Sequence, residues 1–556
     1  MKKRNLVIVV FIAIVLLIGG VVAALYYGGK SAKQAEQEKL VELTDPIVLY
    51  VDIDKLVTKS AINEVFTESN RALIATAIAG EAGRPDSADY ISELMANLDN
   101  SGLNTKQPIY GYGTPNTDGI DNMTIVAEVT DVDKLDSFVE FMIEPYDSEL
   151  GIVREGDMRS VEINGFKMCY DANRFICVVG DDGDDVVMND ALHRGNADLS
   201  AYTKYDVACS VRLKPTLEVV RDNEQIIIDS YAAEIATCTN EWELIWLEDC
   251  MATSQSNIDK ITKIYDMLSE DAMTVMGISF EAGNLAIEVA VNGFDSEFKL
   301  DRKVNNDYLD YVSNDVLAVM DLGVNGQMVS KMLEEVLTTD IADMFGISHN
   351  EYNIYVGILC DAIKSIDGDV ALAVNNISGN HYGVKSVEAL LTMDVSDNYI
   401  ISNVAMFGEG ILRKSDNNVY STKLGGFNLS IGQPEDTLFV TVNMDYAKSD
   451  TPASMARWAA DVEDSYAYML FDVDNIVDNS YASTIYRNAM RGVEKQYAPY
   501  VDGLIESCSH IYVNVNTPNS VEFALVFDDK QTNALEQVVR AFAPIAVGET
   551  IQNVLR

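Results

Sequence analysis

The residues of this chain that could do chemistry are mostly carboxylates, and three Asp-x-Asp pairs recur along it. Each pair follows an apolar, strand-like run and precedes a helix-like pattern: Asp52/Asp54, Asp131/Asp133 and Asp472/Asp474. Paired carboxylates can bind metal or act as a general acid and base. An Asp at the start of a helix also accepts hydrogen bonds from the free N–H groups of the first turn and suits the positive end of the helix dipole. We therefore predict that these aspartates cap helices.

A further cluster of carboxylates lies in the run GDDGDD over residues 180–185. Calcium binds several carboxylate oxygens, so Asp181, Asp182, Asp184 and Asp185 are candidate calcium ligands. No stretch of the sequence has the twelve-residue spacing of an EF-hand loop, and clusters of Gly and Asp are typical of turns. A solvated turn before a helix is the favoured interpretation, with calcium binding as the alternative.

Two tryptophans, Trp242 and Trp246, lie four residues apart in the run NEWELIWL. On a helix they would share one face and could form a platform for a sugar or a peptide. Large aromatic side chains are usually buried, so packing in a core or between helices is the favoured interpretation.

The common signatures of enzymes do not occur in the sequence. The four histidines lack the spacing of paired metal ligands, and the seven cysteines include no C-x-x-C pair. No nucleophile elbow, P-loop or dinucleotide-binding glycine motif follows a predicted strand. With 87 acidic residues, pairs of carboxylates alone cannot identify a glycosidase. The sequence therefore favours a non-enzymatic protein, with no catalytic residue and no cofactor predicted.

An apolar segment near the N-terminus indicates the cellular location of the protein. Residues 6–27 carry no charge, and this length crosses about 30 Å of hydrocarbon as a helix. Lys2, Lys3 and Arg4 precede the segment, so the positive-inside rule keeps the N-terminus in the cytoplasm. A cleaved signal peptide is the alternative. We expect a single-pass, signal-anchored protein of the inner (cytoplasmic) membrane, with its ectodomain on the periplasmic or extracytoplasmic side.

The formal net charge of −47 limits the partners of this ectodomain. Such a surface repels nucleic acid and anionic lipid headgroups, so nucleic acid is excluded as a general partner. Basic proteins, divalent cations and neutral glycans remain possible.

The elements that must position these residues follow a repeated plan. Four apolar runs in residues 45–305 reappear in the same order in residues 306–556, with a nearly constant offset, which predicts two related halves. The matched runs are 48–53 with 316–321, 124–129 with 388–393, 164–179 with 425–442, and 207–211 with 466–470.

A weaker repeat inside each half gives four related β-α-α-β-β-α modules. We predict an α+β fold of mostly antiparallel sheets with packed helices. This duplicated ectodomain would follow an N-terminal transmembrane helix within residues 1–30 and a helical stalk or linker over 31–44.

The opening Asp52–Leu56, the hairpins at Gly165-Phe166 and Gly426-Phe427, and the turn at Ile366–Asp369 also carry a resemblance. The chain resembles an uncharacterised domain-of-unknown-function family of anchored envelope proteins from Bacteroidota-type bacteria. The resemblance covers most of residues 45–556. It implies a place in the cell envelope and supplies no catalytic residues.

These observations favour a membrane-anchored binding or scaffold protein of the cell envelope, whose partner is an unknown envelope protein or glycan. One alternative is an envelope hydrolase that acts on glycan or peptide with carboxylates in a cleft between the halves. Another is a carrier of apolar cargo, which requires a large exposed or cavity-lining apolar surface.

Overall fold

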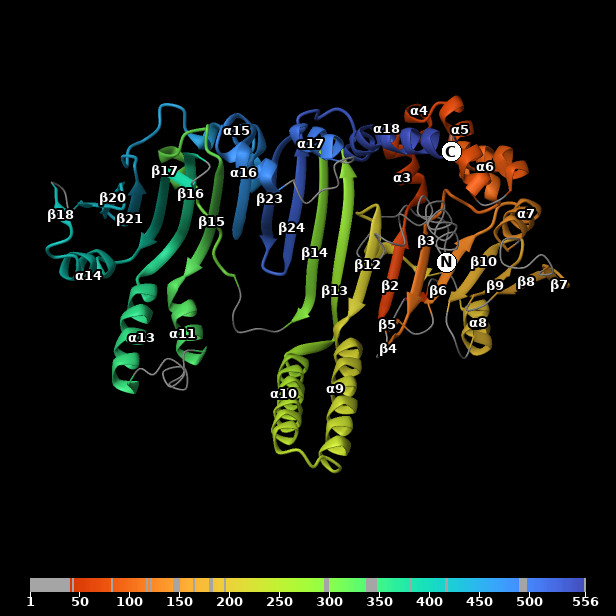
Figure 1. The fold of residues 1–556 in the computed structure, drawn as a ribbon, viewed down its shortest axis with the longest axis horizontal. Helices are drawn as coiled ribbons and strands as arrows, with labels where there is room; N and C mark the ends of the chain where they lie inside the picture. The colour runs from red at the N-terminus through yellow and green to blue at the C-terminus, as the bar shows by residue number, and fades with distance from the viewer. Residues whose placement is uncertain are drawn as a thin grey trace. The chain divides into compact units, whose positions relative to one another are not determined.

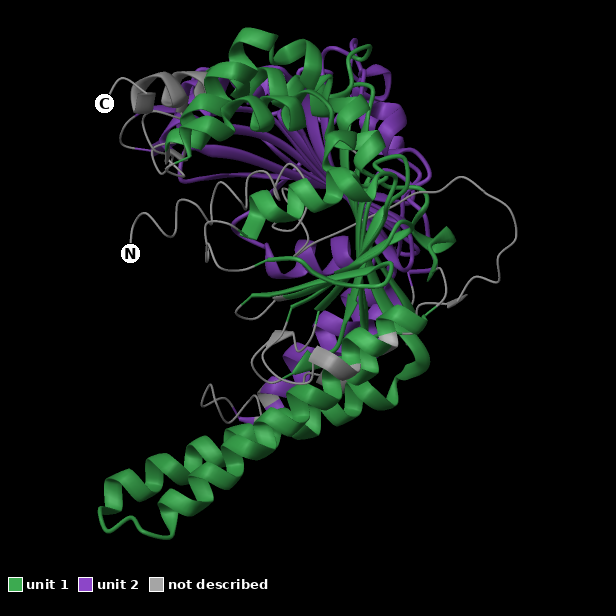
Figure 2. Ribbon diagram, turned by 90° about the vertical axis from the view of Figure 1, so that its right-hand side faces the viewer, with its two compact units in different colours: residues 1–295, 530–556 green, residues 296–529 purple. Residues whose placement is uncertain are grey.

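The chain forms two compact units in the computed structural model. Unit 1 comprises residues 1–295 and 530–556, and unit 2 comprises residues 296–529 (Figure 2). The structure describes residues 41–42, 45–81, 84–116, 119–120, 123–143, 151–163, 166–179, 184–194, 197–294, 300–336, 348–380, 383–415, 419–489 and 498–554.

Unit 1 is built on one sheet in which every neighbouring pair of strands is antiparallel (Figure 1). Along the sequence, the short apolar runs that form these strands alternate with turns, as is typical of antiparallel sheets. In spatial order they are β7 (Val153–Glu155), β8 (Met158–Ile163), β9 (Phe166–Tyr170), β10 (Arg174–Val179), β6 (Met123–Glu128), β3 (Ile109–Gly113), β2 (Ile47–Val51), β12 (Val207–Arg212), β13 (Leu268–Glu281) and β14 (Asn284–Phe294).

The helices of unit 1 occupy the connections between these strands. Four join β2 to β3: α3 (Ile53–Ser60), α4 (Ile62–Val65), α5 (Glu68–Glu81) and α6 (Ala88–Ala96). The others are α7 (Val132–Ile143), α8 (Asp184–His193), the pair α9 (Leu213–Ile235) and α10 (Glu241–Asp266) between β12 and β13, and the C-terminal α18 (Ala534–Val554). Helix α18 packs on α3 and α5, so residues 530–556 complete unit 1.

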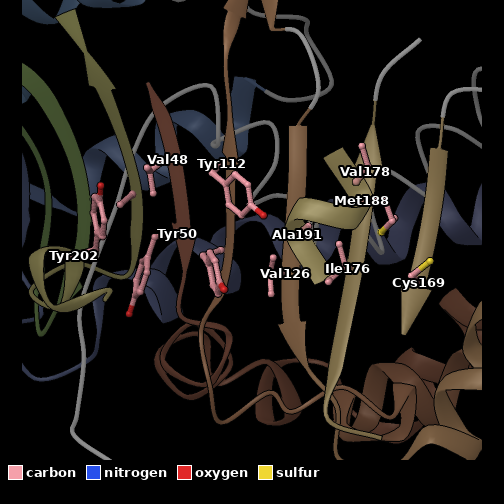
Figure 3. Close-up of a cluster of buried hydrophobic side chains, with 12 residues drawn as sticks. Val48, Tyr50, Tyr112, Val126, Cys169, Ile176, Val178, Met188, Ala191 and Tyr202 are labelled. Atoms are coloured by element: carbon pink, nitrogen blue, oxygen red, sulfur yellow. The ribbon is translucent and has the colours of Figure 1, made fainter. Parts of the chain in front are cut away.

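Hydrophobic side chains pack on both faces of the unit 1 sheet. On one face Tyr50 and Val126 lie with Met188 of α8 and with Tyr202, which belongs to the 3-10 helix Ser200–Tyr202 (Figure 3). On the other face Leu135, Phe138 and Val139 of α7 cover side chains of β6, β8 and β9. Burial of these apolar groups is the main force that holds the helices on the sheet.

Unit 2 has a sheet of the same kind, again with antiparallel neighbours throughout. Its spatial order is β18 (Arg413–Lys414), β19 (Tyr420–Leu424), β20 (Phe427–Gly432), β21 (Thr437–Val442), β17 (Gly383–Val395), β16 (Ile366–Asn380), β15 (Ala318–Asn325), β22 (Ala467–Asp472), β23 (Cys508–Thr517) and β24 (Ser520–Phe527).

The helices of unit 2 lie in the corresponding connections. They are α11 (Gly326–Val336) and α13 (His349–Lys364) between β15 and β16, α14 (Tyr399–Phe407) after β17, and α15 (Val473–Asp478), α16 (Ala482–Ala489) and α17 (Ala498–Glu506) between β22 and β23.

The two sheets place their strands in the same order. Strands β2 and β15 hold one position, β6 and β17 a second, β9–β10 and β20–β21 a third, and β12 and β22 a fourth. These are the places of the four apolar runs that recur in the sequence. Within each sheet the same unit, a strand followed by helices and then by two more strands, occurs twice. The first strands of the two copies pair with each other, β2 with β12 in unit 1 and β15 with β22 in unit 2.

The predicted fold class needs a correction at the N-terminus. The structure is α+β with large antiparallel sheets, but the transmembrane helix expected at residues 6–27 lies outside the described residues. Among the helices that the structure describes, none is long and apolar enough to span a membrane. Helix α10 has 26 residues, but charged side chains recur along it from Glu241 to Asp266. Within the expected stalk over 31–44, the described residues Val41–Glu42 form a short strand, β1.

Candidate functional site

The Asp-x-Asp pairs act as helix caps through their first member. Asp52 Oδ1 accepts a hydrogen bond from Lys55 N at 3.0 Å at the start of α3. Asp472 Oδ1 does the same with Asn475 N at 3.0 Å at the start of α15. Capping is thereby confirmed for the first aspartate of these two pairs, because the bonds satisfy N–H groups that a helix leaves free. The expectation that the second aspartate also caps is wrong, since Asp54 and Asp474 pair with Lys106 and Arg457 instead.

The third pair shows how the two aspartates differ. Asp131 Oδ1 accepts hydrogen bonds from the backbone N–H groups of Asp133 and Lys134, both at 3.1 Å. The structure assigns no such bond to the Asp133 carboxylate, which is exposed on the first turn of α7. The cap is therefore Asp131, and Asp133 only faces water.

The predicted calcium cluster falls largely on residues that the structure does not describe. Asp181 and Asp182 lie outside the described residues, and Asp184 and Asp185 form the first turn of α8, where their side chains are not described. Calcium binding there stays a prediction. Among the described residues, no group of three His, Cys, Asp or Glu side chains is arranged to hold a metal ion.

The two tryptophans lie on α10, but the favoured interpretation of a packed core is wrong. Trp242 is 82% exposed and Trp246 is 57% exposed. The Trp246 ring meets the Tyr231 ring of α9 edge-on, with centroids 6.3 Å apart. Trp246 therefore makes a contact between helices, which was the other packing role expected of these tryptophans.

An exposed apolar surface on the sheet of unit 2 is the site that sequence reasoning missed. In a strand, alternate side chains point to opposite faces. In β15, Val319 and Asp321 are buried on one face, whereas Met320 and Leu322 are exposed on the other. A carboxyl group is therefore buried on one face while two large apolar side chains are exposed on the other, which departs from the usual pattern of apolar residues inside and polar residues outside.

The exposed side chains continue from strand to strand across the sheet. Seven apolar residues, each directly opposite the next on the neighbouring strand, form what we call the apolar row. Four of them are exposed and three are half-buried. In spatial order the row is Val440, Leu391, Leu372, Met320, Met469, Val513 and Phe523.

More apolar side chains of unit 2 are exposed around the row and on the helices. Phe471 and Val521 lie on β22 and β24, two residues from Met469 and Phe523, so they share the face of the row. On α13 and around α14 the exposed apolar residues are Ile354, Tyr355, Leu359, Met406, Phe407 and Ile411.

In unit 1 the equivalent row is less exposed. It runs through Cys177, Ile125, Gly111, Leu49, Cys209, Met276 and Val289. None of these residues is exposed. The exposed row is therefore a property of unit 2 and not of the shared strand order.

Two loop segments cover the opposite face of the unit 2 sheet. The first contains the 3-10 helix Asp307–Tyr311, and its Tyr308 hydroxyl lies 2.9 Å from the hydroxyl of Tyr468 on β22. The second contains fully buried Trp458 and also Tyr446, whose ring stacks on Phe439 of β21 at 4.1 Å. The apolar row lies on the face of the sheet that points away from these two segments.

A pair of buried carboxyl groups lies beneath the first of these loops. Asp321 of β15 and Asp369 of β16 are diagonal neighbours on one face of the sheet, close enough for one carboxyl group, when protonated, to donate a hydrogen bond to the other. Asp369 Oδ2 accepts from the backbone N–H groups of Asn305 and Asn306 at 2.8 and 3.2 Å. These bonds hold the loop on the sheet.

The electrostatics of this pair favour one shared proton. Burial raises the pKa of Asp321 to about 8, and repulsion from Asp369 and Asp394 adds to the effect. Burial also raises the pKa of Asp369, although its bonds to the loop backbone oppose the rise. A protonated Asp321 donates from Oδ2, which has no other partner, to the Asp369 carboxylate. Both groups are buried, so the pair stabilises the loop and is closed to a substrate.

A chain of Ser, His and Asp side chains lies on β23 and the second loop. His510 Nδ1 lies 3.0 Å from Ser509 Oγ, and His510 Nε2 lies 2.9 Å from Asp461 Oδ2. These residue types form the triad of serine hydrolases. Ser509 is 1% exposed, however, so its hydroxyl cannot meet a substrate, and the chain serves to tie the loop to the sheet.

Comparison with known proteins identifies a family for this chain but does not indicate an activity. A family model described as Domain of unknown function (DUF4836) matches residues 40–535. No curated protein matches the chain. A solved structure, "Structure of crystal form III of TP0453", is similar with 7% sequence identity over 48% of this chain and 83% of that chain. Its TM-score of 0.24 is too low to support a conclusion about this chain.

Proposed function

The chain belongs to the family described as Domain of unknown function (DUF4836), and we propose that it is a non-enzymatic binding protein whose ligand lies on the apolar row of unit 2. The observation that carries the proposal is the row itself, in which Met320 and Met469 remain 36% and 39% exposed in the middle of a sheet. Contiguous exposed apolar surface on a soluble domain marks a binding site.

The dimensions and charge of the surface limit the ligand. Seven strands span six inter-strand spacings of about 4.8 Å, so the row is about 29 Å long. An elongated ligand, such as a long acyl chain, can cover such a row, whereas a compact one cannot. The net charge of −47 repels anionic ligands, so the ligand is neutral or cationic. This makes the chain a carrier of apolar cargo.

The test uses a neutral polarity-sensitive dye and its displacement by a neutral monoacylglycerol. Met320→Ser/Met469→Ser removes two apolar side chains from the middle of the row and should weaken dye and ligand binding about tenfold, because burial of each side chain supplies part of the binding free energy. Met455→Ser is the matched control, since Met455 is 83% exposed and lies on the 3-10 helix Ala453–Met455 of unit 2, outside the strands that carry the apolar row. Equal binding by all three proteins would overturn the proposal.

The rival hydrolase predicts turnover instead of stable binding. Nothing in the buried Asp321–Asp369 pair or in the buried Ser509 favours it. Reproducible turnover of peptidoglycan, polysaccharide or peptide that one carboxylate or hydroxyl substitution abolishes would replace the binding role.

The proposal includes a place in the cell envelope of Bacteroidota-type bacteria. Its support is the resemblance seen at Asp52–Leu56 and the charge pattern before residue 6. The expected partners, a membrane through residues 6–27 and an envelope protein or glycan, stay predictions. Protease added to spheroplasts should digest units 1 and 2 while cytosolic controls survive, and protection of both units would place the protein in the cytoplasm.

A further inference from the structure

Helices α9 and α10 form a long hairpin that projects from the sheet of unit 1. The hairpin is inserted between the paired strands β12 and β13, which hold its base (Figure 1). In the two helices together the buried residues are Leu247 and Ser254. The contact between the helices is therefore a narrow seam, and most of the hairpin surface faces water.

The charges of the hairpin are separated along its length. Residues 222–259, which make up its outer part, contain nine carboxylates and no Lys, Arg or His. The cations lie nearer the sheet, where Lys214 pairs with Glu270 at 2.5 Å. Because no cation within residues 222–259 neutralises them, the carboxylates create a negative potential at the outer end.

Four large apolar side chains are exposed within this acidic region: Ile226 on α9 and three on α10. Trp242, Ile245 and Trp246 are 82%, 54% and 57% exposed. They lie at spacings of three and four residues, so they share one side of α10 with Glu241 and Asp249. Asn240 caps α10 through a 3.1 Å bond from Trp242 N, and Tyr231 contacts Trp246, so the patch is held in place.

We propose that this patch, which we call the arm tip (Trp242, Ile245 and Trp246 with Glu241 and Asp249), docks a basic segment of another protein that carries apolar side chains along one face. Tryptophan supplies much of the binding energy in protein interfaces, and a negative rim attracts and orients a positive partner. The inference is independent of the apolar row, because the arm tip belongs to unit 1 and the row to unit 2.

The same charges argue against two other occupants. An anionic membrane surface is repelled by the carboxylates around the patch. A second copy of the chain would bring one acidic arm tip against another, which like charges disfavour.

The experiment uses the full chain and a synthetic amphipathic helical peptide made of Lys and Leu, without tryptophan. The chain contains three tryptophans, and Trp458 is fully buried, so a change in tryptophan emission on binding reports Trp242 and Trp246. We expect a shift of the emission to shorter wavelength as the peptide covers the rings. Binding should weaken several-fold as salt is raised from about 0.05 M to about 0.5 M, because salt screens exposed charges.

Substitutions separate the apolar and the electrostatic contributions. Trp242→Ala should weaken peptide binding at least about tenfold, as expected of an interface tryptophan, without affecting folding, since the side chain is exposed. Glu241→Gln/Asp249→Asn should weaken it about fivefold at low salt. Asp450→Asn/Glu463→Gln is the matched control: it removes the same charge from exposed positions of unit 2 and should leave binding unchanged.

Three outcomes would overturn the proposal. The first is equal affinity for a peptide of the same composition whose Lys and Leu residues do not segregate to opposite faces of a helix. The second is an emission shift with vesicles of zwitterionic lipid in place of the peptide, which would make the arm tip a membrane contact. The third is a concentration-dependent rise in mass that Trp242→Ala abolishes, which would make it a contact between copies.

Discussion

Met320 of β15 lies directly opposite Met469 of β22, and both side chains point away from the loops that cover the other face of the unit 2 sheet. The sheet is built from two copies of one unit, a strand followed by helices and then by two more strands, and β15 and β22 are the first strands of these copies. The apolar row therefore passes through the centre of the unit. A surface at that place is determined by the pairing of the strands and not by the conformation of a loop.

Helix capping gives a prediction with an internal control. Asp131→Ala should lower the free energy of unfolding by about 0.5–2 kcal/mol, because it removes the acceptor of two backbone N–H groups at the start of α7. Asp133→Ala should change it by less than about 0.5 kcal/mol, as for most exposed positions. Urea denaturation measures both. A larger effect at Asp133 than at Asp131 would contradict the assignment of the cap.

The buried carboxyl pair predicts how stability depends on pH. The pKa of Asp321 is raised in the folded protein, so the folded state binds the proton more tightly than the unfolded state, whose Asp has a pKa near about 3.9. The contribution of protonated Asp321 to the free energy of unfolding is fully present below about pH 4. It is lost as the pH rises through the pKa of Asp321 in the folded protein, which is about 8.

Asp321→Asn tests this dependence, because an amide can donate to Asp369 as the protonated carboxyl does and does not titrate. The variant should lose less stability than the natural chain between about pH 5 and about pH 9 in urea denaturation. Asp315→Asn, at an exposed position of unit 2, should not alter the dependence. If Asp321→Asn and the natural chain lose stability equally over this range, Asp321 does not carry the proton.

The Ser509–His510–Asp461 chain predicts an absence of serine hydrolase chemistry. A fluorophosphonate probe should not label the folded full chain at Ser509, because the hydroxyl is buried. Mass spectrometry of the treated protein measures the labelling, with Ser509→Ala as the control. Labelling that disappears in Ser509→Ala would show that the site opens and would support the hydrolase.

The strands and the helix caps could be predicted from the sequence because both depend on residues that are close together in the chain. The Asp-x-Asp pairs could be assigned to helix starts because an Asp after a strand-like run satisfies free N–H groups of its own helix. The runs around Val48 and Val316 could be matched because similar patterns of burial need similar apolar residues. Both inferences depend on neighbours in the sequence and not on distant parts of the chain.

The apolar row and the arm tip could not be reached in this way. Alternation in β15 shows that Met320 and Leu322 share a face opposite Asp321, but it does not show which face a distant loop covers. Trp242 and Trp246 could be placed on one helical face, yet their exposure depends on the projection of α9 and α10 from the sheet. The buried Asp321–Asp369 pair also depends on the pairing of β15 with β16, which no local pattern specifies.

The most direct test of the binding role is methionine methyl NMR of the full chain with a neutral monoacylglycerol. The signals of Met320 and Met469 are assigned with Met320→Leu and Met469→Leu, and Met455 serves as the exposed reference away from the row. Saturating ligand should shift the Met320 and Met469 methyl signals and leave that of Met455 in place. Ligand binding that leaves the Met320 and Met469 signals unchanged would contradict the account.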